Sequence, residues 1–461
     1  MDLLSLTGCR YLNHLKINQI SMYKNHHNCR VCGSIRLKKY IDLGELPLSN
    51  NLCETVHESS PRFPLQVMLC QDCGLSQLSV VVDPNILFGH YVYRSSINKG
   101  YVEHCRRMAV DLKERYCLNK DSFMVDIAGN DGALLLEFKS EIGLSILNID
   151  PAVNLSTICH AKGVPTLNKF WGKDVGIGVS MVDYRTKVYS KSRETEPQDN
   201  RADLITATNV FAHVDDVFDF MEGVKAALKP TGVLVLEFPY LIDFIENNEF
   251  DTIYFEHLSY FSIIPLWRLC QKVGLNIMRV EKHAIHGGTV RVHIGYWDSD
   301  DTVQPFLDHE STLTDKTYQD FNTASFKAIY QFRDTLNLLK NKGFKIAGFA
   351  ASAKGNTLLN CAGITCGTMD YIIDETPEKI GKYSPGTHIP IVSILDMGKP
   401  DYIVILSWNF ADEIMKKLRG VGYCGQFIIP IPEFKIVDDW SNAVTIIKEE
   451  HVEIKPPYFT E

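Results

Sequence analysis

The chain has 461 residues, of which 45% are hydrophobic and 22% are charged, and its formal net charge is −9. These values are those of ordinary globular proteins and exclude a disordered, collagen-like or coiled-coil chain. At ~100–200 residues per domain, this length predicts more than one domain. The acidic balance, without a long basic stretch, argues against nucleic acid as a partner.

The sequence contains thirteen cysteines, scattered along a long chain, which does not suit a disulfide-stapled secreted module. We therefore expect a reducing compartment in which some thiols bind a metal. The N-terminus lacks the apolar core of a signal peptide, and no stretch approaches the ~18 apolar residues of a membrane helix. A cytoplasmic location without membrane contact is the expectation.

The first part of the chain divides into a polar leader, residues 1–28, to which we assign no function, and a segment of paired cysteines, residues 29–95. This segment has few large apolar residues and needs a staple to fold. Two CxxC pairs, each followed by glycine, supply one: Cys29, Cys32, Cys70 and Cys73. Four thiolates would close a tetrahedral zinc site, so the metal is predicted to be structural. Four ordinary buried cysteines or a redox pair are the alternatives.

Residues 96–300 alternate short apolar runs with helical patterns, which predicts βαβ units and a parallel sheet. A further pair of strand patterns is separated only by AIHGGT and predicts an antiparallel hairpin at the sheet edge. The charged stretch 186–200 is predicted to be a surface insertion. The predicted strands are residues 123–128, 145–150, 203–208, 233–238, 276–283 and 290–297.

Apolar residues recur at helical spacing over residues 311–342, and Gly343 stands where this helix should stop. A second series of strand patterns follows: KIAGFAA, YIIDE, IPIVSI, YIVILSW and QFIIPIPE. The fold class is therefore α/β, with a second α/β unit after the helix.

The first strand of the parallel sheet ends in a loop that opens a helix, and this loop is rich in small and acidic residues: Asp126, Ala128, Gly129, Asn130, Asp131 and Gly132. Asp150 follows the second strand, where an acid can hold ribose hydroxyls. A GxGxxG fingerprint is absent, and the carboxylates would repel a pyrophosphate. This favours S-adenosylmethionine (SAM) over NAD, with a generic strand-to-helix turn as the alternative.

Titratable and aromatic residues follow other strand ends and form a candidate catalytic and substrate-binding set: Tyr254, Glu256, His257, His213, Glu237, Tyr91, Tyr93 and His286. Asn209, which also follows a strand, is predicted to bind the cofactor. A histidine has a pKa near neutrality and can abstract a proton, and an adjacent glutamate could orient it. Each such residue alone is more often structural. Their repeated placement after strands is what indicates a site.

The second α/β unit carries the loop 351–357 between a strand and a helix, with Lys354 and Asn356 in it. Backbone N–H groups at a helix N-terminus and a lysine can bind an anion such as a diphosphate. The spacing is not that of a Walker A loop, and a solvated lysine in an ordinary turn is the alternative.

Many of these motifs together resemble the SAM-dependent sugar C-methyltransferases of deoxysugar pathways, of the tetronitrose C-3-methyltransferase type. CRVCGS, LCQDCGLSQL and YVYRSS resemble the zinc-binding domain of that family, and VDIAGNDGALL resembles its cofactor loop. NVFAHVDD, YFEHLSYFS, HGGTVRV, AKGNTLLN, GKYSPGTHIPI, LSWNF and PIPE follow in the family's order. The resemblance covers about residues 28–435.

The resemblance implies a class I methyltransferase Rossmann-like core (96–300) with a zinc-binding lid (29–95), a helical linker (301–343) and a C-terminal α/β nucleotide-sugar domain (344–461). It implies methyl transfer to C3 of a nucleotide-linked 4-keto-6-deoxy sugar, typically a dTDP sugar, bound between domains. Tyr254, Glu256 and His257 then fall on the catalytic YxEH. His213 is the second histidine, and Tyr91 or Tyr93 is the lid tyrosine.

On this reading, His257 is the base, Glu256 orients it, and Tyr254, His213 and a lid tyrosine hold the keto oxygen. Glu237, His286, Lys354 and Asn356 would bind substrate, zinc would serve only folding, and the chain would be a monomer or a weak homo-oligomer. Ala128 departs from the family's glycine and threatens cofactor binding. Methylation of another acceptor, an NAD(P)-dependent sugar oxidoreductase and a non-catalytic binding protein stay open as alternatives.

Overall fold

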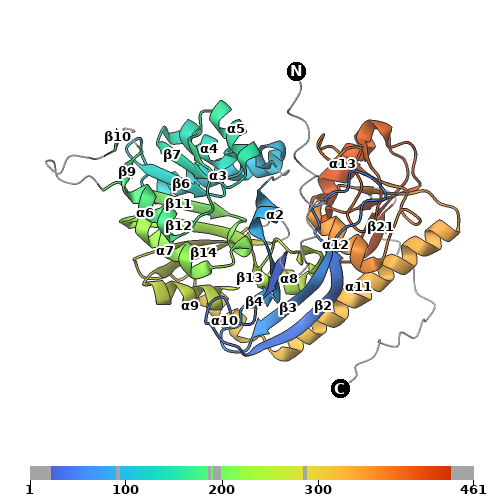
Figure 1. Ribbon diagram of the computed structural model, residues 1–461, viewed down its shortest axis with the longest axis horizontal. Helices are drawn as coiled ribbons and strands as arrows, with labels where there is room; N and C mark the ends of the chain where they lie inside the picture. Colours follow the sequence, from blue (N-terminus) through green and yellow to red (C-terminus); the bar gives the residue numbers. More distant parts are fainter. Residues whose placement is uncertain (1–21, 90–93, 185–187, 190–198, 284–287, 438–461) are drawn as a thin grey trace. The chain divides into compact units, whose positions relative to one another are not determined.

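The computed structural model describes residues 22–89, 94–184, 188–189, 199–283 and 288–437 (Figure 1). Tyr91, Tyr93, His286 and most of the leader and of the 186–200 insertion lie outside the described residues. The contacts divide the chain into two units, one of residues 1–50 and 61–324 and one of residues 51–60 and 325–461. The domain boundaries expected from the sequence stay a prediction.

The larger sheet of the first unit has the strand order β14-β15-β12-β11-β6-β7-β8. Its parallel strands are β6 (Phe123–Ile127), β7 (Ser145–Ile149), β8 (Thr166–Leu167), β11 (Ala202–Thr208) and β12 (Leu228–Pro239). The predicted antiparallel hairpin is β14 (Asn276–His283) and β15 (Thr289–Gly295), and β15 pairs with β12. The prediction of a parallel sheet with a hairpin edge is therefore confirmed.

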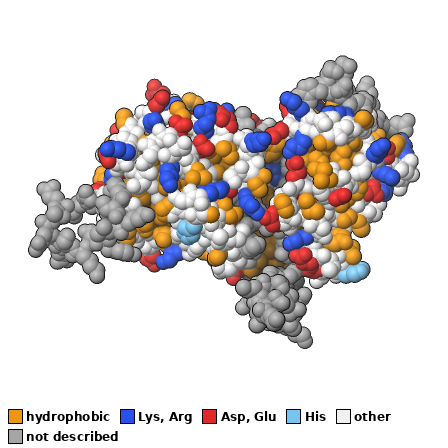
Figure 2. Space-filling model, turned by 90° about the horizontal axis from the view of Figure 1, so that it is seen from above, with side chains coloured by type: hydrophobic (Ala, Val, Ile, Leu, Met, Phe, Trp, Pro, Cys, Tyr) orange, Lys and Arg blue, Asp and Glu red, His pale blue; other side chains and the backbone are white. Residues whose placement is uncertain are grey.

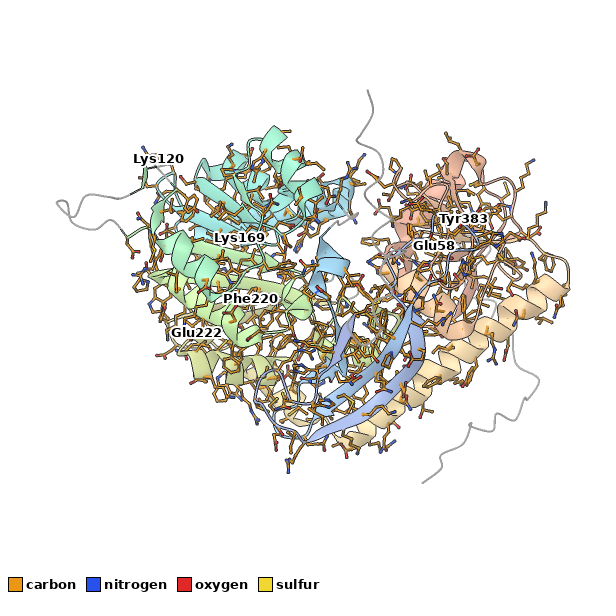
Figure 3. All side chains as sticks on the ribbon, in the orientation of Figure 1. Glu58, Lys120, Lys169, Phe220, Glu222 and Tyr383 are labelled. Atoms are coloured by element: carbon orange, nitrogen blue, oxygen red, sulfur yellow. The ribbon has the colours of Figure 1, made fainter. Side chains whose placement is uncertain are left out.

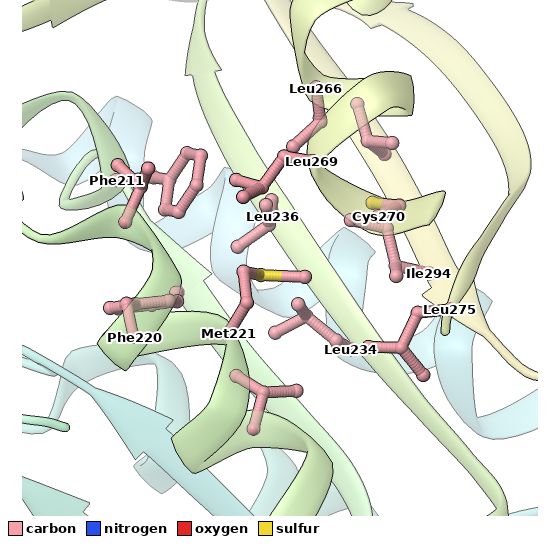
Figure 4. Packing of buried hydrophobic residues seen from close by; sticks show 14 of the residues in the cluster. Phe211, Phe220, Met221, Leu234, Leu236, Leu266, Leu269, Cys270, Leu275 and Ile294 are labelled. Atoms are coloured by element: carbon pink, nitrogen blue, oxygen red, sulfur yellow. The ribbon is translucent and has the colours of Figure 1, made fainter. Parts of the chain in front are cut away.

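Nearly every residue of β6 and β7 is buried, because both faces of the sheet lie under helices. One face packs on α3 (Lys99–Arg115) and α4 (Ala133–Ile142). The other packs on α7 (Val217–Ala227) and α9 (Ile263–Val273), with Phe211, Met221, Leu236 and Leu269 at its centre (Figure 4). The remaining helices of this unit are α2 (Pro84–Phe88), α5 (Val153–Ala161), α6 (Lys173–Ser180), α8 (Leu241–Glu246), α10 (Gln304–Ser311) and the 3-10 turns η2 (Ser95–Ile97), η3 (Phe211–His213) and η4 (Phe250–Thr252).

The cysteine-rich segment folds as a second, antiparallel sheet with the order β13-β4-β3-β2. Its strands are β2 (Leu37–Pro47), β3 (Arg62–Cys70), β4 (Ser76–Leu78) and β13 (Ser259–Tyr260), and β1 (Tyr23–Asn25) pairs separately with β5 (Val80–Val82). Strand β13 is distant in sequence from the other three strands and begins two residues after the YFEH motif, residues 254–257. The cysteine-rich sheet is thereby joined to that motif by backbone hydrogen bonds.

The helix predicted over residues 311–342 is confirmed as the continuous helix α11 (Asp315–Asn341), which begins four residues later than predicted, after the end of α10 at Ser311. Near its start, α11 packs against the cysteine-rich sheet, where the Tyr318 ring lies 5.0 Å from the ring of Tyr40. Gly343 adopts the positive φ of 88° that ends the helix, as the sequence predicts.

The second unit is built on a sheet with the order β18-β17-β16-β19-β20-β21. Strands β16 (Ile346–Phe349), β17 (Tyr371–Asp374), β18 (Ile391–Ser393), β19 (Tyr402–Ile405) and β20 (Gln426–Ile429) are parallel and confirm the predicted series, and β21 (Lys435–Val437) adds an antiparallel edge. Helices α12 (Ala353–Ala362) and α13 (Ala411–Gly420) and the turns η5 (Ile394–Asp396) and η6 (Trp408–Phe410) complete it. This strand order is that of a Rossmann-like sheet.

Residues 51–60 belong to the second unit although they stand between β2 and β3 in the sequence. Cys53 forms a β-bridge with Tyr383, and the Gly386 N–H donates to Ser60 Oγ at 3.1 Å. Glu58 and Tyr383, labelled in Figure 3, mark this region. The second unit is thus built from two segments of the chain that are far apart in sequence, residues 51–60 and the residues from 325 onward.

Within the described part of the chain, no helix combines the length and the apolar character that a membrane crossing requires. On the face drawn in Figure 2, Lys and Arg side chains are interspersed with Asp and Glu side chains.

Candidate active site and metal centre

The four predicted cysteines come together. The Sγ atoms of Cys29, Cys32, Cys70 and Cys73 all lie within 4.8 Å of one another, with 3.3 Å between Cys29 and Cys73 and 3.5 Å between Cys32 and Cys70. A tetrahedral zinc with Zn–S bonds of about 2.3 Å separates its sulfurs by about 3.8 Å, so the cluster fits the ion. Four thiolates fill the coordination sphere and leave no position for water, which makes the site structural.

The two halves of the metal centre have the same backbone. In each, the first cysteine accepts a hydrogen bond from the N–H of a glycine at positive φ, Gly33 at 76° or Gly74 at 82°. The positive φ lets the chain fold back under the sulfurs, which explains why glycine follows each pair.

Two buried carboxylates lie at the carboxyl ends of β6 and β7. Asp126 is 1% exposed and accepts from Thr206 Oγ1 at 2.7 Å, and burial together with the charge of Asp150 raises its pKa to about 7. Asp150 accepts from the N–H groups of Ala152 at 2.8 Å and Asn130 at 3.0 Å, and burial raises its pKa as well. A pair of buried acids disfavours a phosphate and suits a nucleoside with ribose hydroxyls and a cationic sulfur.

The predicted cofactor loop, residues 126–132, is tightly packed at Gly129, not at Ala128. A Cβ on Gly129 would lie 2.5 Å from Asp126 Oδ2 and 2.6 Å from Asn148 Oδ1. Ala128 is partly exposed but holds a φ of 55°, a conformation in which glycine is less strained. The alanine therefore fits the loop at a cost in backbone energy.

Asn130, Asp131 and Gly132 shape the loop. Asn130 Oδ1 accepts from the Ser95 N–H at 3.0 Å, while the buried Asp131 accepts from the Ser96 N–H at 3.2 Å, from Ser96 Oγ and from Lys162 Nζ at 3.1 Å. Gly132, at φ 79°, opens α4. The structure thus shows Asp131 as the anchor of the turn Ser95–Ile97.

The candidate catalytic residues form a hydrogen-bonded group around His257. Its Nδ1 lies 2.9 Å from the Thr252 carbonyl oxygen, and its Nε2 lies 2.8 Å from the Tyr254 hydroxyl. A carbonyl only accepts, so Nδ1 carries the proton and Nε2 presents its lone pair, to which Tyr254 donates. The ring of His213, on η3, lies 5.1 Å from the His257 ring, and burial lowers the pKa of His213 to about 4.

Glu256 is close in sequence but does not orient the imidazole. It is 2% exposed, accepts from Asn50 Nδ2 at 2.9 Å through Oε1, and burial raises its pKa. The prediction that Glu256 orients His257 is wrong, because the Thr252 carbonyl and Tyr254 take both ring nitrogens. A backbone carbonyl has no sequence signature, so the motif alone could not reveal this.

Asn209 and Glu237 lie at the ends of β11 and β12. Asn209 adopts a φ of 55° and its N–H donates to the Glu237 carbonyl at 2.7 Å, which ties the two strand ends together. The Glu237 carboxylate is bound by His104 at 2.8 Å and Arg291 at 2.7 Å. Although burial opposes ionisation, these two partners lower its pKa to about 2. Its role is an internal ion cluster, so we do not keep Glu237 among the substrate-binding residues.

The second unit places Lys354 and Asn356 at the start of α12, beside the point where the strand order reverses between β16 and β19. Lys354 Nζ lies 4.7 Å from the centre of the Trp408 ring, and Ser352 Oγ caps the helix by accepting from the Gly355 N–H at 3.1 Å. Asp374, at the end of β17, accepts from the Ala351 N–H at 2.8 Å. In Rossmann-like sheets, ligands bind at this switch point.

Three families match the chain in order: a zinc binding domain over residues 29–88, a methyltransferase domain over residues 101–280 and a C-methyltransferase C-terminal domain over residues 284–432. With the β14-β15-β12-β11-β6-β7-β8 sheet and the Cys₄ cluster, they define a class I SAM-dependent methyltransferase with a structural zinc site.

The chain is also 31% identical over 423 residues to the C-methyltransferase NovU of Streptomyces niveus, covering 89% of this chain and 96% of that protein. The chain therefore belongs to this family of C-methyltransferases.

Other similarities are weaker. A ubiquinone biosynthesis O-methyltransferase of Rhodopseudomonas palustris is 30% identical over 132 residues, which is 29% of this chain and 45% of that protein. A magnesium protoporphyrin IX methyltransferase from Synechocystis PCC 6803 aligns with a TM-score of 0.31 and 9% identity over 42% of this chain and 83% of that one, and this likeness carries no weight.

Proposed function

We propose that this enzyme methylates carbon C3 of a nucleotide-linked 4-keto-6-deoxy sugar, such as a dTDP sugar. The observation that carries the proposal is the His257 imidazole, whose Nδ1–H is bound to the Thr252 carbonyl so that Nε2 is left as the basic nitrogen. A carbon acceptor must first lose a proton, and an imidazole nitrogen that carries no proton can remove one. The C-methyltransferase relative and the C-terminal domain family support carbon as the acceptor.

His257 and Tyr254 have separate roles in the proposed reaction. SAM, when bound, supplies an electrophilic methyl group. Nε2 of His257 takes the C3 proton, which the neighbouring keto group makes acidic, and the resulting imidazolium keeps its Nδ1–H on Thr252. The hydroxyl of Tyr254 turns from Nε2 to the keto oxygen and donates to it as negative charge develops there. His257 then releases its proton to solvent.

His213 assists by remaining neutral. Burial lowers its pKa to about 4, so it brings no positive charge next to the imidazolium that forms 5.1 Å away, measured between ring centres. A neutral ring can also donate one hydrogen bond to the substrate. We keep Glu256, whose pKa is raised by burial, as a carboxyl group near the acceptor, a lid tyrosine at Tyr91 or Tyr93, and Lys354 and Asn356 as contacts of the diphosphate.

The test is mass spectrometry of the purified protein with methyl-labelled SAM and a panel of nucleotide 4-keto-6-deoxy sugars, followed by NMR of the product. A gain of one methyl group on C3 is expected. A labelled methyl group on oxygen would support the O-methylation alternative. Absence of transfer to every keto sugar, with SAM bound, would contradict the proposal.

A further inference from the structure

Arg30 stands inside the metal centre's first half, between Cys29 and Cys32, and its side chain is 0% exposed. Its guanidinium makes three hydrogen bonds from two of its nitrogens. Nε donates to Asp215 Oδ1 at 3.2 Å, and Nη1 donates to the carbonyl oxygens of Leu78 and Leu258, each at 3.2 Å. A buried arginine with this many partners holds other segments in place.

Two of these acceptors belong to the segments that present the histidines. Leu258 follows His257 directly, and Asp215 comes two residues after His213. The rings of His213 and His257 lie 5.1 Å apart, measured between their centres. The Arg30 side chain therefore bonds to both of the segments that carry this pair of histidines. The Leu258 carbonyl also accepts from the Leu78 N–H at 2.9 Å, which places Arg30 at the end of the β4–β13 ladder.

Hydrogen bonds hold the backbone around Arg30 in place. Its own N–H donates to Gln77 Oε1 at 2.9 Å, and Gln77 Nε2 donates to the Asn28 carbonyl at 2.9 Å. Lys272, on α9, donates to the Val31 carbonyl at 3.0 Å. The residues on both sides of Arg30 are thereby held to β4 and α9. A metal bound to Cys29 and Cys32 would further restrict the backbone of Arg30.

We propose that Arg30 is a positioning residue that fixes the His213 and His257 segments relative to one another, and that the metal centre acts on catalysis through it. This inference rests on the proposed function of the two histidines. It extends the role expected from the sequence, in which zinc serves only folding. A lysine should not replace Arg30, because its three bonds come from two separate nitrogens of a rigid plane, Nε and Nη1, whereas a lysine donates from one nitrogen only.

The experiment compares Arg30→Met and Arg30→Lys with Arg36→Met, a matched change in the same module. Arg36 is 65% exposed and pairs with Asp72 between the second pair of cysteines, so its loss should change activity by less than about two-fold. For both Arg30 variants we expect wild-type zinc content and SAM affinity, unchanged KM for the sugar and a kcat lower by about 100-fold, as for a small displacement of catalytic groups.

Hydrogen–deuterium exchange supplies a readout that does not depend on turnover. In Arg30→Met, backbone amides of residues 211–216 and 254–260 should exchange about tenfold faster than in the wild type, while β6 and β7 should be unaffected. Unchanged exchange in both segments would overturn the inference.

If Arg30→Met fails to retain zinc, Asp215→Asn tests the same point with the metal centre intact. Of the three Arg30 hydrogen bonds, this change weakens only the one to the His213 segment, and it also weakens the ion pair of Asp215 with Lys24 at 2.7 Å, for which Lys24→Met is the matched control. Exchange should rise over residues 211–216 more in Asp215→Asn than in Lys24→Met, and not over 254–260, and no such rise would overturn the inference. A wild type without sugar methylation, together with faster exchange in the variants, would refute the proposed function and leave the positioning role. A wild type that methylates the sugar, together with unchanged exchange in the variants, would support the proposed function and refute the positioning role of Arg30.

Discussion

Two adjacent residues of the cofactor loop should respond to substitution with opposite signs. Gly129 has no positive φ, so alanine is allowed by its backbone, but the new methyl would lie 2.5 Å from Asp126 Oδ2 and 2.6 Å from Asn148 Oδ1. Both neighbours are buried, at 1% and 0% exposure, and Asp126 is held by Thr206 at 2.7 Å. Forcing them apart costs about 1–3 kcal/mol. Because Asp126 is predicted to lie in the cofactor site, SAM affinity should fall about tenfold or more.

Ala128→Gly is the matched change next to it. A left-handed backbone costs a residue with a Cβ about 1–2 kcal/mol, and the greater freedom of glycine in the unfolded chain returns about 0.5–1 kcal/mol of that. Since φ at Ala128 is 55°, this variant should gain about 0.5–1 kcal/mol of unfolding free energy. Urea unfolding and calorimetry with SAM measure both effects. A Gly129→Ala variant as stable as the wild type, or a less stable Ala128→Gly, would refute the reasoning.

Three further predictions concern the base, the metal and an internal ion cluster. His257→Gln should lower kcat about 10²–10⁴-fold at unchanged SAM affinity, and steady-state kinetics with an undiminished kcat would exclude His257 as the base. Removal of zinc by a chelator should lower the melting temperature of the first unit, whereas a melting curve that chelation leaves unchanged would show that the cysteine cluster does not depend on a metal. The folded pKa of Glu237 is lowered from 4.5 to about 2, so its stabilisation is complete above pH 4.5 and is lost as the pH falls through 2. This amounts to about 3 kcal/mol at 1.36 kcal/mol per pKa unit, and Glu237→Gln should remove that part of the acid dependence of unfolding, whereas parallel curves for the two proteins would contradict it.

Much of the fold could be predicted because it depends on the pattern of apolar and polar residues within short segments of the sequence. Runs such as 123–128 and 145–150 are apolar, short and bounded by polar residues, and they became β6 and β7. The CxxC pairs predicted the cysteine cluster because two thiolates three residues apart can bind the same zinc ion. The acids at the ends of β6 and β7 followed from strand order alone.

What could not be predicted depends on contacts between distant segments. Strand β13 has two residues and exists because it pairs with β4, and residues 51–60 join the second unit through Tyr383 and Gly386. The orientation of His257 is set by a backbone carbonyl, and Glu237 is neutralised by His104 and Arg291, which lie far away in sequence. The catalytic roles of the site residues stay predictions.

Deprotonation at C3 by His257 is the central claim, and isotope exchange tests it without methyl transfer. The enzyme is incubated in D₂O with a nucleotide 4-keto-6-deoxy sugar and S-adenosylhomocysteine, and deuterium at C3 is followed by NMR against a sample without enzyme. The account predicts enzyme-dependent entry of deuterium at C3 that His257→Gln abolishes. Exchange that equals the sample without enzyme, or that proceeds at the wild-type rate in His257→Gln, would contradict it.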